Sequence, residues 1–303
     1  MVDMKVNLRG LEMKTPVATA SGTFGYGLEY EGVADYSGIG AITAKGVRMQ
    51  PWPGNPMPRH VEVPGGMINA IGLQGPGAEA FVRWTLPRVA ALGIPVIANV
   101  WGGSVEEYAE AAAVLDAAPG TAALEVNVSC PNVKNGGHTF GSSPRILAET
   151  VRAVRRAVKK PLFVKLAPNV PDIAPYVKTL EDEGADGVSL INTLPAMAID
   201  IERRKPVLGN VTGGLSGRCV HPVAVKAVYD AHRASSLPIL AMGGVYGPAD
   251  AVELMLAGAS AVAVGTATFT DPSTASRTAR GIEEYCRSHG FSAVRDLTGA
   301  LEG

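Results

Sequence analysis

The sequence predicts an α/β protein built as a single (β/α)8 barrel (a TIM barrel), with the active site at the carboxyl ends of the strands. Short runs rich in Val, Ile and Ala recur eight times, and segments with helical periodicity separate most of them. Glycine is also frequent, at 36 of 303 residues, as expected for many tight strand-to-helix turns. No linker divides the chain, so one domain is expected over residues 1–303. A doubly wound open sheet is the alternative.

The expected elements alternate along the chain. Strands are predicted at 17–20, 39–43, 95–100, 123–128, 161–166, 187–192, 238–242 and 261–265. Helices are predicted at 104–116, 144–159, 172–183, 222–234 and 248–257. Three of these helices begin at a proline, whose missing N–H would have no partner in a first turn. The proline-rich segment 51–58 is either an ordered excursion in which Trp52 and Met57 pack, or a plain surface loop.

Composition limits the possible partners and the compartment. The formal net charge is −1, with 27 Lys and Arg against 28 Asp and Glu, which gives no electrostatic basis for binding nucleic acid or a membrane surface. The widely spaced Cys130, Cys219 and Cys286 suit neither a disulfide framework nor a metal site, so a reduced, cytoplasmic setting is expected. No signal peptide is evident, and the longest apolar run, 89–101, is too short to span a bilayer.

Polar side chains stand where the predicted strands end. They are Lys45, Asn99, Asn127, Lys165 and Asn192. Each alone is more simply explained as a turn-forming amide or as a lysine reaching solvent. Together they would converge on one rim if the barrel closes, because barrel enzymes carry their chemistry at the carboxyl ends of the strands. Alternation along strand 123–128 also turns Asn127 toward the barrel mouth.

Glycines follow the last two strands, in A-M-G-G-V (241–245) and A-V-G-T-A (263–267). A tight turn would explain either motif. The occurrence of glycines after both of the last two strands favours a phosphate-bearing ligand, because glycine lets backbone N–H groups approach an anion. Two lysines, several amides and a phosphate site indicate a large polar cofactor with a small substrate beside it.

One cysteine differs from the other two. Cys219 and Cys286 are expected to be small buried apolar side chains. Cys130 instead lies between a strand and a glycine-rich loop, in E-V-N-V-S-C-P-N-V-K-N-G-G (125–137), and that loop has the composition of a mobile lid. Its thiol could act as a nucleophile with His138, or as an acid/base beside a cofactor. The second role is favoured because no third group is evident to orient a Cys–His pair.

Further motifs extend over nearly the whole chain in order. They are T-A-S-G-T-F (19–24), T-A-K-G-V (43–47), M-I-N-A-I-G-L-Q-G-P-G (67–77), I-A-N-V-W-G (97–102), the cysteine motif (125–137), V-K-L-A-P-N-V (164–170), I-N-T-L-P-A-M-A-I-D (191–200), T-G-G-L-S-G (212–217), M-G-G-V (242–245) and V-G-T-A (264–267). With these motifs the chain resembles the class 1 dihydroorotate dehydrogenases, the FMN enzymes of pyrimidine biosynthesis.

The resemblance implies a barrel that oxidises (S)-dihydroorotate to orotate on one tightly bound FMN per chain. Cys130 would take the C5 proton while the C6 hydride passes to flavin N5. Lys165 would stabilise negative charge at the flavin N1/O2 edge. The implied substrate-binding residues are Lys45, Asn69, Ala70, Ile71, Gly72, Leu73, Asn127, Asn132, Asn192 and Thr193. The implied FMN-binding residues are Ala20, Ser21, Gly22, Lys45, Gly46, Asn99, Asn127, Lys165, Ile191, Ser216 and Gly217, with Gly243, Gly244, Gly265 and Thr266 at the phosphate.

The resemblance also bears on the electron acceptor. Quinone-linked members use a serine base and carry an N-terminal membrane-associating extension, neither of which is expected here. The motifs at 191–200 and 212–217 resemble the NAD-linked type 1B more than the fumarate-reducing type 1A. Type 1B implies a separate subunit with FAD and a [2Fe–2S] cluster, in a heterotetramer around a core homodimer. Three scattered cysteines cannot hold a cluster on four thiolates, and the chain has no G-x-G-x-x-G dinucleotide motif.

Two departures and several alternatives stay open. The family usually has Asn where Gly75 stands, and P-A-I-K-P where this chain has R-C-V-H-P (218–222), which brings Cys219 near the flavin-side Gly217. The rival functions are a type 1A enzyme, a dihydropyrimidine dehydrogenase-like enzyme acting on uracil, a flavin-free phosphate-binding lyase or isomerase, and a non-catalytic binding role.

Overall fold

The computed structural model describes residues 2–129, 140–141 and 143–302. Within them, eight parallel strands close a barrel in the order β10-β15-β16-β3-β4-β7-β8-β9. The strands are β3 (Val17–Thr19), β4 (Ala41–Thr43), β7 (Val96–Val100), β8 (Ala123–Asn127), β9 (Leu162–Leu166), β10 (Gly187–Leu190), β15 (Ile239–Met242) and β16 (Ala261–Val264). Pairing of β16 with β3 closes the ring, which confirms the predicted barrel over the doubly wound sheet.

The barrel strands are buried along their whole length. Their outward apolar side chains meet the surrounding helices, which explains the continuous Val/Ile/Leu/Ala runs. The fully or almost fully buried polar side chains of these strands are Thr19, Thr43, Asn99, Glu125, Asn127, Lys165 and Ser189. Polar groups in the strands are therefore concentrated in β3, β4 and β7 to β10, whereas β15 and β16 are wholly apolar.

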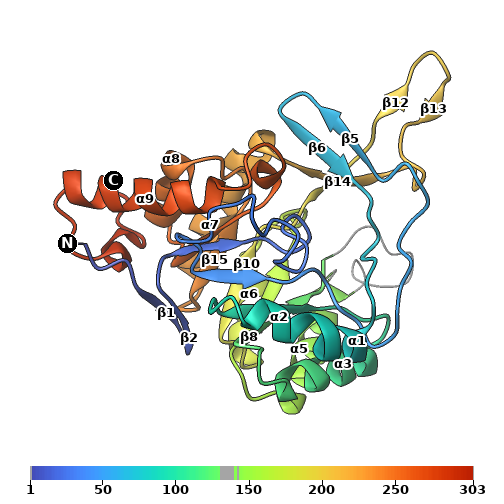
Figure 1. Ribbon diagram of the computed structural model, residues 1–303, viewed down its shortest axis with the longest axis horizontal. Helices are drawn as coiled ribbons and strands as arrows, with labels where there is room; N and C mark the ends of the chain where they lie inside the picture. Colours follow the sequence, from blue (N-terminus) through green and yellow to red (C-terminus); the bar gives the residue numbers. More distant parts are fainter. Residues whose placement is uncertain (1, 130–139, 142, 303) are drawn as a thin grey trace.

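Helices surround the barrel (Figure 1), and the five predicted ones are confirmed. They are α3 (Val105–Ala117), α5 (Pro144–Ala157), α6 (Ala174–Asp182), α7 (His221–Ala234) and α8 (Pro248–Leu256). Serine caps begin two of them: Ser104 Oγ accepts the N–H of Glu107, and Ser143 Oγ accepts the N–H of Ile146. The predicted ends differ from the observed ends by no more than two residues, the usual uncertainty at fraying helix ends.

The first crossover, from β3 to β4, runs through turns in place of a helix. The last helix, α9 (Thr274–Ser288), covers β3 instead and also packs on β16. Gly38 permits this close approach, because a Cβ there would lie 2.5 Å from the Cα of Ser276. The second crossover contains α1 (Ala78–Ala80), the π-helical η1 (Phe81–Thr85) and α2 (Leu86–Ala90) in succession.

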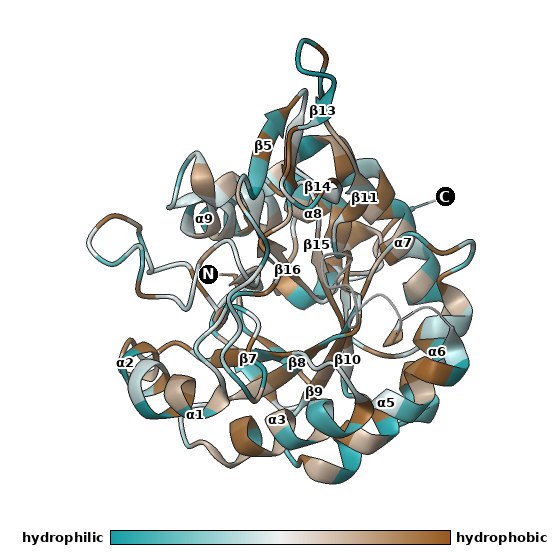
Figure 2. Cartoon of the chain, turned by 90° about the vertical axis from the view of Figure 1, so that its right-hand side faces the viewer, coloured by the Kyte–Doolittle hydropathy of each residue, from teal (hydrophilic) through white to brown (hydrophobic). Residues whose placement is uncertain are grey.

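An antiparallel sheet that the sequence did not predict lies over the carboxyl end of the barrel. Its order is β11-β14-β6-β5, from β5 (His60–Val63), β6 (Gly66–Asn69), β11 (Leu194–Ala196) and β14 (Gly213–Ser216). The hairpin of β12 (Ile199–Asp200) and β13 (Lys205–Pro206) projects beside it, at the top of Figure 2. Ile68, Ala70 and Leu208 form a small separate core under this sheet.

The remaining short elements are β1 (Val6–Leu8) and β2 (Leu11–Met13), which form a hairpin, and the 3-10 turns η2 (Arg218–Val220), η3 (Thr266–Phe269) and η4 (Val294–Leu297). Among the described residues, no helix combines the length and apolar character needed to cross a bilayer.

Of the two side chains expected to pack in the proline-rich segment 51–58, Trp52 packs and Met57 does not. The Trp52 ring packs edge-to-face on Trp101 at 5.9 Å, and the Arg48 guanidinium lies over both rings, 4.9 and 4.7 Å from their centroids. Met57, in contrast, is 69% exposed. Trp52 therefore anchors the start of this segment to the loop that follows β7.

Candidate active site

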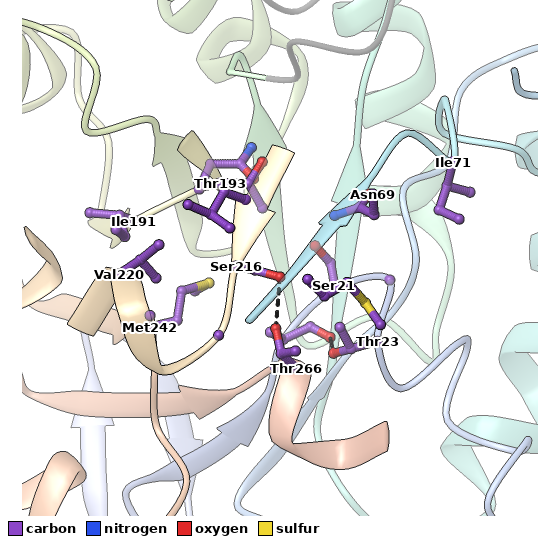
Figure 3. A pocket seen from close by; sticks show the side chains of 18 of the residues that line it. Ser21, Thr23, Asn69, Ile71, Ile191, Thr193, Ser216, Val220, Met242 and Thr266 are labelled. Carbon is purple, nitrogen blue, oxygen red and sulfur yellow. Dashed lines mark hydrogen bonds between the residues drawn. The ribbon is translucent and has the colours of Figure 1, made fainter. Parts of the chain in front are cut away.

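A cavity of about 600 Å³ lies at the carboxyl ends of the barrel strands, between them and the antiparallel sheet. Figure 3 shows side chains that line it. Its size falls in the usual range of small-molecule sites, about 300–1,000 Å³. The predicted site residues that line it are Ala20, Ser21, Gly22, Lys45, Gly46, Asn69, Ile71, Gly72, Leu73, Asn127, Lys165, Ile191, Asn192, Thr193, Ser216, Gly217, Gly243, Gly244, Gly265 and Thr266.

Four predicted residues are not placed at the cavity surface. Cys130 and Asn132 lie outside the described residues, as does most of the loop expected to close over the site. Ala70 is fully buried in the small core under the antiparallel sheet. Asn99 is fully buried behind Gly46, where its Nδ2 donates to Glu125 Oε1 at 2.6 Å. A Cβ at Gly46 would lie 2.9 Å from Asn99 Oδ1, so this amide lies directly against Gly46, which lines the cavity.

Lys165 lies deep in the cavity, at 5% exposure. It follows Val164 on β9, and alternation turns its side chain inward while its apolar neighbours face the helices. Its Nζ is 3.4 Å from Ser21 Oγ, a contact at the limit of a hydrogen bond. A buried ammonium is costly unless oxygen atoms surround it, so a bound ligand with negative character would complete its environment.

Lys45 brings a second cation to the cavity. Burial is the main reason that the pKa of Lys45 lies below its usual value; nearby Glu29 raises this pKa and Arg59 lowers it. Glu29 itself is held in place, since its carboxylate accepts the N–H groups of Tyr26, Gly27 and Leu28. The backbone N–H of Lys45 donates to the carbonyl of Gly25 in the same turn. The Glu29 turn thus fixes the backbone from which the Lys45 ammonium extends.

A hydrogen-bond network joins β8, β9 and the end of β10. Asn192 Nδ2 donates to Ser129 Oγ at 2.8 Å and to Asn127 Oδ1 at 3.3 Å, and Asn192 Oδ1 accepts the N–H of Thr193. Ser129 Oγ donates to the carbonyl of Lys165 at 2.9 Å. Within the described residues, Asn127 Nδ2 has no acceptor, so this amide can donate to a ligand in the cavity. Sequence reasoning did not select Ser129, although alternation places it on the same face as Asn127.

The far end of the cavity has the character of an anion cradle. Gly243 and Gly244 both have positive φ, 128° and 71°, which side-chain-bearing residues rarely adopt. Gly217 also has positive φ, and a Cβ there would lie 2.5 Å from the Cα of Gly66. Thr266 Oγ1 donates to Ser216 Oγ at 2.8 Å, the dashed line in Figure 3. Glycine backbone N–H groups and side-chain hydroxyl groups at this end can bind a phosphate.

The family comparison decides how these features are interpreted. The family model described as "Dihydroorotate dehydrogenase" matches residues 3–286. This chain belongs to the dihydroorotate dehydrogenase family. The predicted family is therefore confirmed.

Relatives within this family are close to the chain in length and sequence. A protein of Pelobacter propionicus, 53% identical over 300 residues and covering 99% of each chain, is named "Dihydroorotate dehydrogenase B (NAD(+)), catalytic subunit". A protein of Geobacter sp. strain M21 carries the same name and is 52% identical, covering 99% of this chain and 98% of the relative. The solved structure of DHODH in complex with ferulenol from Eimeria tenella has a TM-score of 0.83 at 23% identity, over 98% of this chain and 88% of that one. This structural similarity supports the barrel fold alone.

In this member of the family, the cavity also has a lining that sequence reasoning missed. Those residues are Thr23, His60, Glu62, Met67, Leu215, Val220, Met242, Val245, Tyr246 and Phe269. Most come from the antiparallel sheet or from loops, and only Met242 lies in a barrel strand. Apolar residues such as Val220 and Met242 carry no sequence signal that separates a cavity wall from a core.

The other two cysteines differ from each other. Cys286 is fully buried, as predicted, and burial raises its pKa, with smaller contributions from Asp296 and Glu283. The expectation of burial was wrong for Cys219, which is exposed. Cys219 belongs to η2, and its thiol packs beside Gly66, the first residue of β6.

Proposed function

We propose that this protein is the catalytic subunit of an NAD-linked dihydroorotate dehydrogenase and oxidises (S)-dihydroorotate to orotate in pyrimidine biosynthesis, with one FMN per chain. The observation that carries this proposal is one cavity with two unlike ends. Buried Lys165 and the Asn127–Asn192 network lie at one end, and the glycines at 243 and 244 lie at the other. The names of the relatives support the same reaction.

The cavity fits FMN in size and in the groups it offers. Gly243, Gly244, Gly265 and Thr266 would hold its phosphate, and Ser21, Gly46 and Lys165 would hold the ring system. Bound FMN would supply the acceptor for the hydride that leaves C6 of dihydroorotate. Lys165 would stabilise the negative charge that develops next to it, and its burial strengthens that effect because little water competes.

The amides would bind the substrate ring. A dihydropyrimidine edge alternates N–H donors and C=O acceptors, and an asparagine amide offers one of each. Asn127 Nδ2 and Asn69 would contact that edge, and Lys45 would pair with the carboxylate of dihydroorotate. Ser129 and Thr193 orient Asn192, which limits the positions that the ring can take.

Cys130 would be the base. Loss of a proton from C5 to its thiolate and of a hydride from C6 leaves the C5–C6 double bond of orotate, so atoms and charge balance. Cys130 directly follows Ser129, whose hydroxyl is fixed on the carbonyl of Lys165.

A partner subunit would complete the reaction. We infer that electrons leave through a subunit with FAD and a [2Fe–2S] cluster to NAD, in a heterotetramer built on a core homodimer. The relatives' name "catalytic subunit" supports such a partner.

Anaerobic mixing of the FMN-loaded chain with dihydroorotate tests the reaction and its base. Dihydroorotate should bleach the flavin, and Cys130→Ala should slow bleaching by at least about 10²-fold, the scale of lost acid/base catalysis. Cys219→Ala is the matched control because its thiol is exposed. Equal rates in the wild type and Cys130→Ala would contradict the proposed base. Bleaching by a dihydropyrimidine in place of dihydroorotate would contradict the proposed substrate.

The identity of the physiological electron acceptor is tested in a separate assay. Turnover with NAD should appear only when the partner subunit is added. NAD reduction by the isolated chain, or efficient turnover with fumarate, would contradict the NAD-linked assignment.

A further inference from the structure

The first residue of α7, His221, contacts the phosphate end of the cavity. Its side chain is 12% exposed, and its Nδ1 lies 2.8 Å from the carbonyl oxygen of Gly243. Its Nε2 lies 3.1 Å from Glu253 Oε2, on α8. One imidazole thus joins α7, the loop after β15 and α8.

The contact with Gly243 defines which ring nitrogen donates. A backbone carbonyl can only accept a hydrogen bond. Nδ1–H of His221 therefore donates to the Gly243 carbonyl, and Nε2 faces the carboxylate of Glu253.

The contact with Gly243 also sets the direction of a cavity-lining N–H. In a planar trans peptide, the C=O of one residue and the N–H of the next point in opposite directions. Because His221 holds the carbonyl of Gly243, the N–H of Gly244 points away from the imidazole. Gly244 lines the cavity, and within the part of the chain described its N–H has no protein acceptor. A Cβ on Gly244 would lie 2.6 Å from the Cβ of His221, so the two residues are packed directly together.

A cation lies on the segment just before α7. The Arg218 guanidinium is 4.4 Å from the centroid of the Tyr246 ring, and Tyr246 lines the cavity. Asp250 on α8 accepts the N–H of Tyr246. Burial raises the pKa of Tyr246, so it stays neutral at physiological pH, and arginine stays charged.

We propose that His221 is a positioning residue for the phosphate of the cofactor: its Nδ1–H holds the Gly243 carbonyl and so presents the Gly244 N–H to the phosphate. This inference rests on the proposed FMN cofactor. It assigns a function to a segment, 218–222, that the substrate and flavin ring do not explain.

The test compares FMN with riboflavin, which has the same ring system without the phosphate. The full chain, with its flavin removed, is titrated with each compound by flavin fluorescence. His221→Ala should weaken FMN binding by about 10-fold or more, the scale of a lost charge-assisted hydrogen bond, and leave riboflavin binding within about 2-fold. His221→Asn keeps a neutral donor near the Nδ1 position and should recover part of the lost FMN affinity. His232→Ala is the matched control, since His232 is exposed on the same helix and packs on Gly258 and Gly299.

Each outcome bears on a different claim. Equal losses of FMN and riboflavin affinity in His221→Ala, or tight FMN binding that the substitution does not change, would overturn the role of His221 alone. Failure of His221→Asn to recover any of the FMN affinity that His221→Ala loses would also overturn it. Wild-type protein that binds neither compound would overturn the proposed cofactor as well.

Discussion

The barrel and the antiparallel sheet enclose one cavity but differ in how deeply their strands are buried. Every residue of β7, β8 and β9 is buried, whereas the residues of β5 alternate between exposed and partly exposed. The barrel supplies Lys165 and the Asn127 network, and the sheet supplies Asn69 and Ser216. Groups that need exact placement thus come from the tightly packed layer, and groups that enclose the ligand come from the thinner one.

The two regions also differ in the core beneath them. The barrel shares the main hydrophobic core, but the sheet rests on the small cluster of Ile68, Ala70 and Leu208. Lower local stability is a common property of segments that cover a binding site. This contrast predicts that substitutions in the barrel affect stability and rate, and that substitutions in the sheet affect binding.

The largest expected effect on stability concerns the barrel core. Phe163 on β9 is fully buried against Gly187, and Phe163→Ala should lower the free energy of unfolding by about 3–5 kcal/mol. Urea denaturation measures this loss. Ile201, next to β12, is 79% exposed, so Ile201→Ser should change the same quantity by less than about 0.5 kcal/mol. Similar losses in the two variants would remove the contrast between the regions.

Among substitutions of the residues that the structure describes, Lys165→Ala should have the largest effect on rate. Loss of the buried ammonium removes a group placed to stabilise developing charge, so the anaerobic reduction of bound flavin should slow by about 10²–10³-fold. Stopped-flow absorbance measures the rate, and retention of flavin on a desalting column serves as the control for binding. A fall of less than threefold with flavin retained would show that Lys165 is not catalytic.

Asn69→Ala tests the sheet. Asn69 ends β6, and its Nδ2 is 3.3 Å from the carbonyl of Gly214 on β14. We expect the KM for dihydroorotate to rise by about 10-fold with little change in the limiting rate of flavin reduction, as for a group that binds substrate and transition state equally. A proportional loss of limiting rate would instead place Asn69 among the residues that act on the reacting atoms.

The smallest effect is expected in the outer helix α6, which contributes no residue to the lining of the cavity. Glu181 on α6 has a pKa lowered to about 2, first by a hydrogen bond from Ser236 and then by Lys178. Because the folded pKa is below the unfolded value of 4.5, this stabilisation is present above pH 4.5 and is lost as the pH falls toward 2. Ser236→Ala should therefore lower the free energy of unfolding by about 1 kcal/mol near neutral pH, and by less in acid. Unfolding curves at several pH values check the trend, with flavin reduction unchanged.

Sequence reasoning recovered the barrel and missed the sheet for a physical reason. Barrel strands and their helices carry local signals, such as the apolar run of 161–166 or the serine that caps α3. The sheet depends on pairing of β6 with β14, which are far apart in the sequence, short and rich in glycine. The register between neighbouring strands is equally hard to predict from the sequence. Asn99 was predicted as a polar residue at a strand end, but only the structure shows its amide bound to Glu125 on the next strand. The roles of Cys130 and Asn132 stay predictions from the sequence.

The seam between β16 and β3 has a consequence for how the chain is made. Val17 pairs with Val262, so the first barrel strand to be synthesised cannot complete its pairing until the last one has been made. Until α9 follows, one edge of β3 and its outer apolar face are without their cover. A ribosome adds about 5–20 residues per second, so an unpaired, aggregation-prone edge persists for many seconds on each nascent chain. Barrel closure thus requires synthesis of β16, the last barrel strand, and the edge of β3 stays unpaired until then.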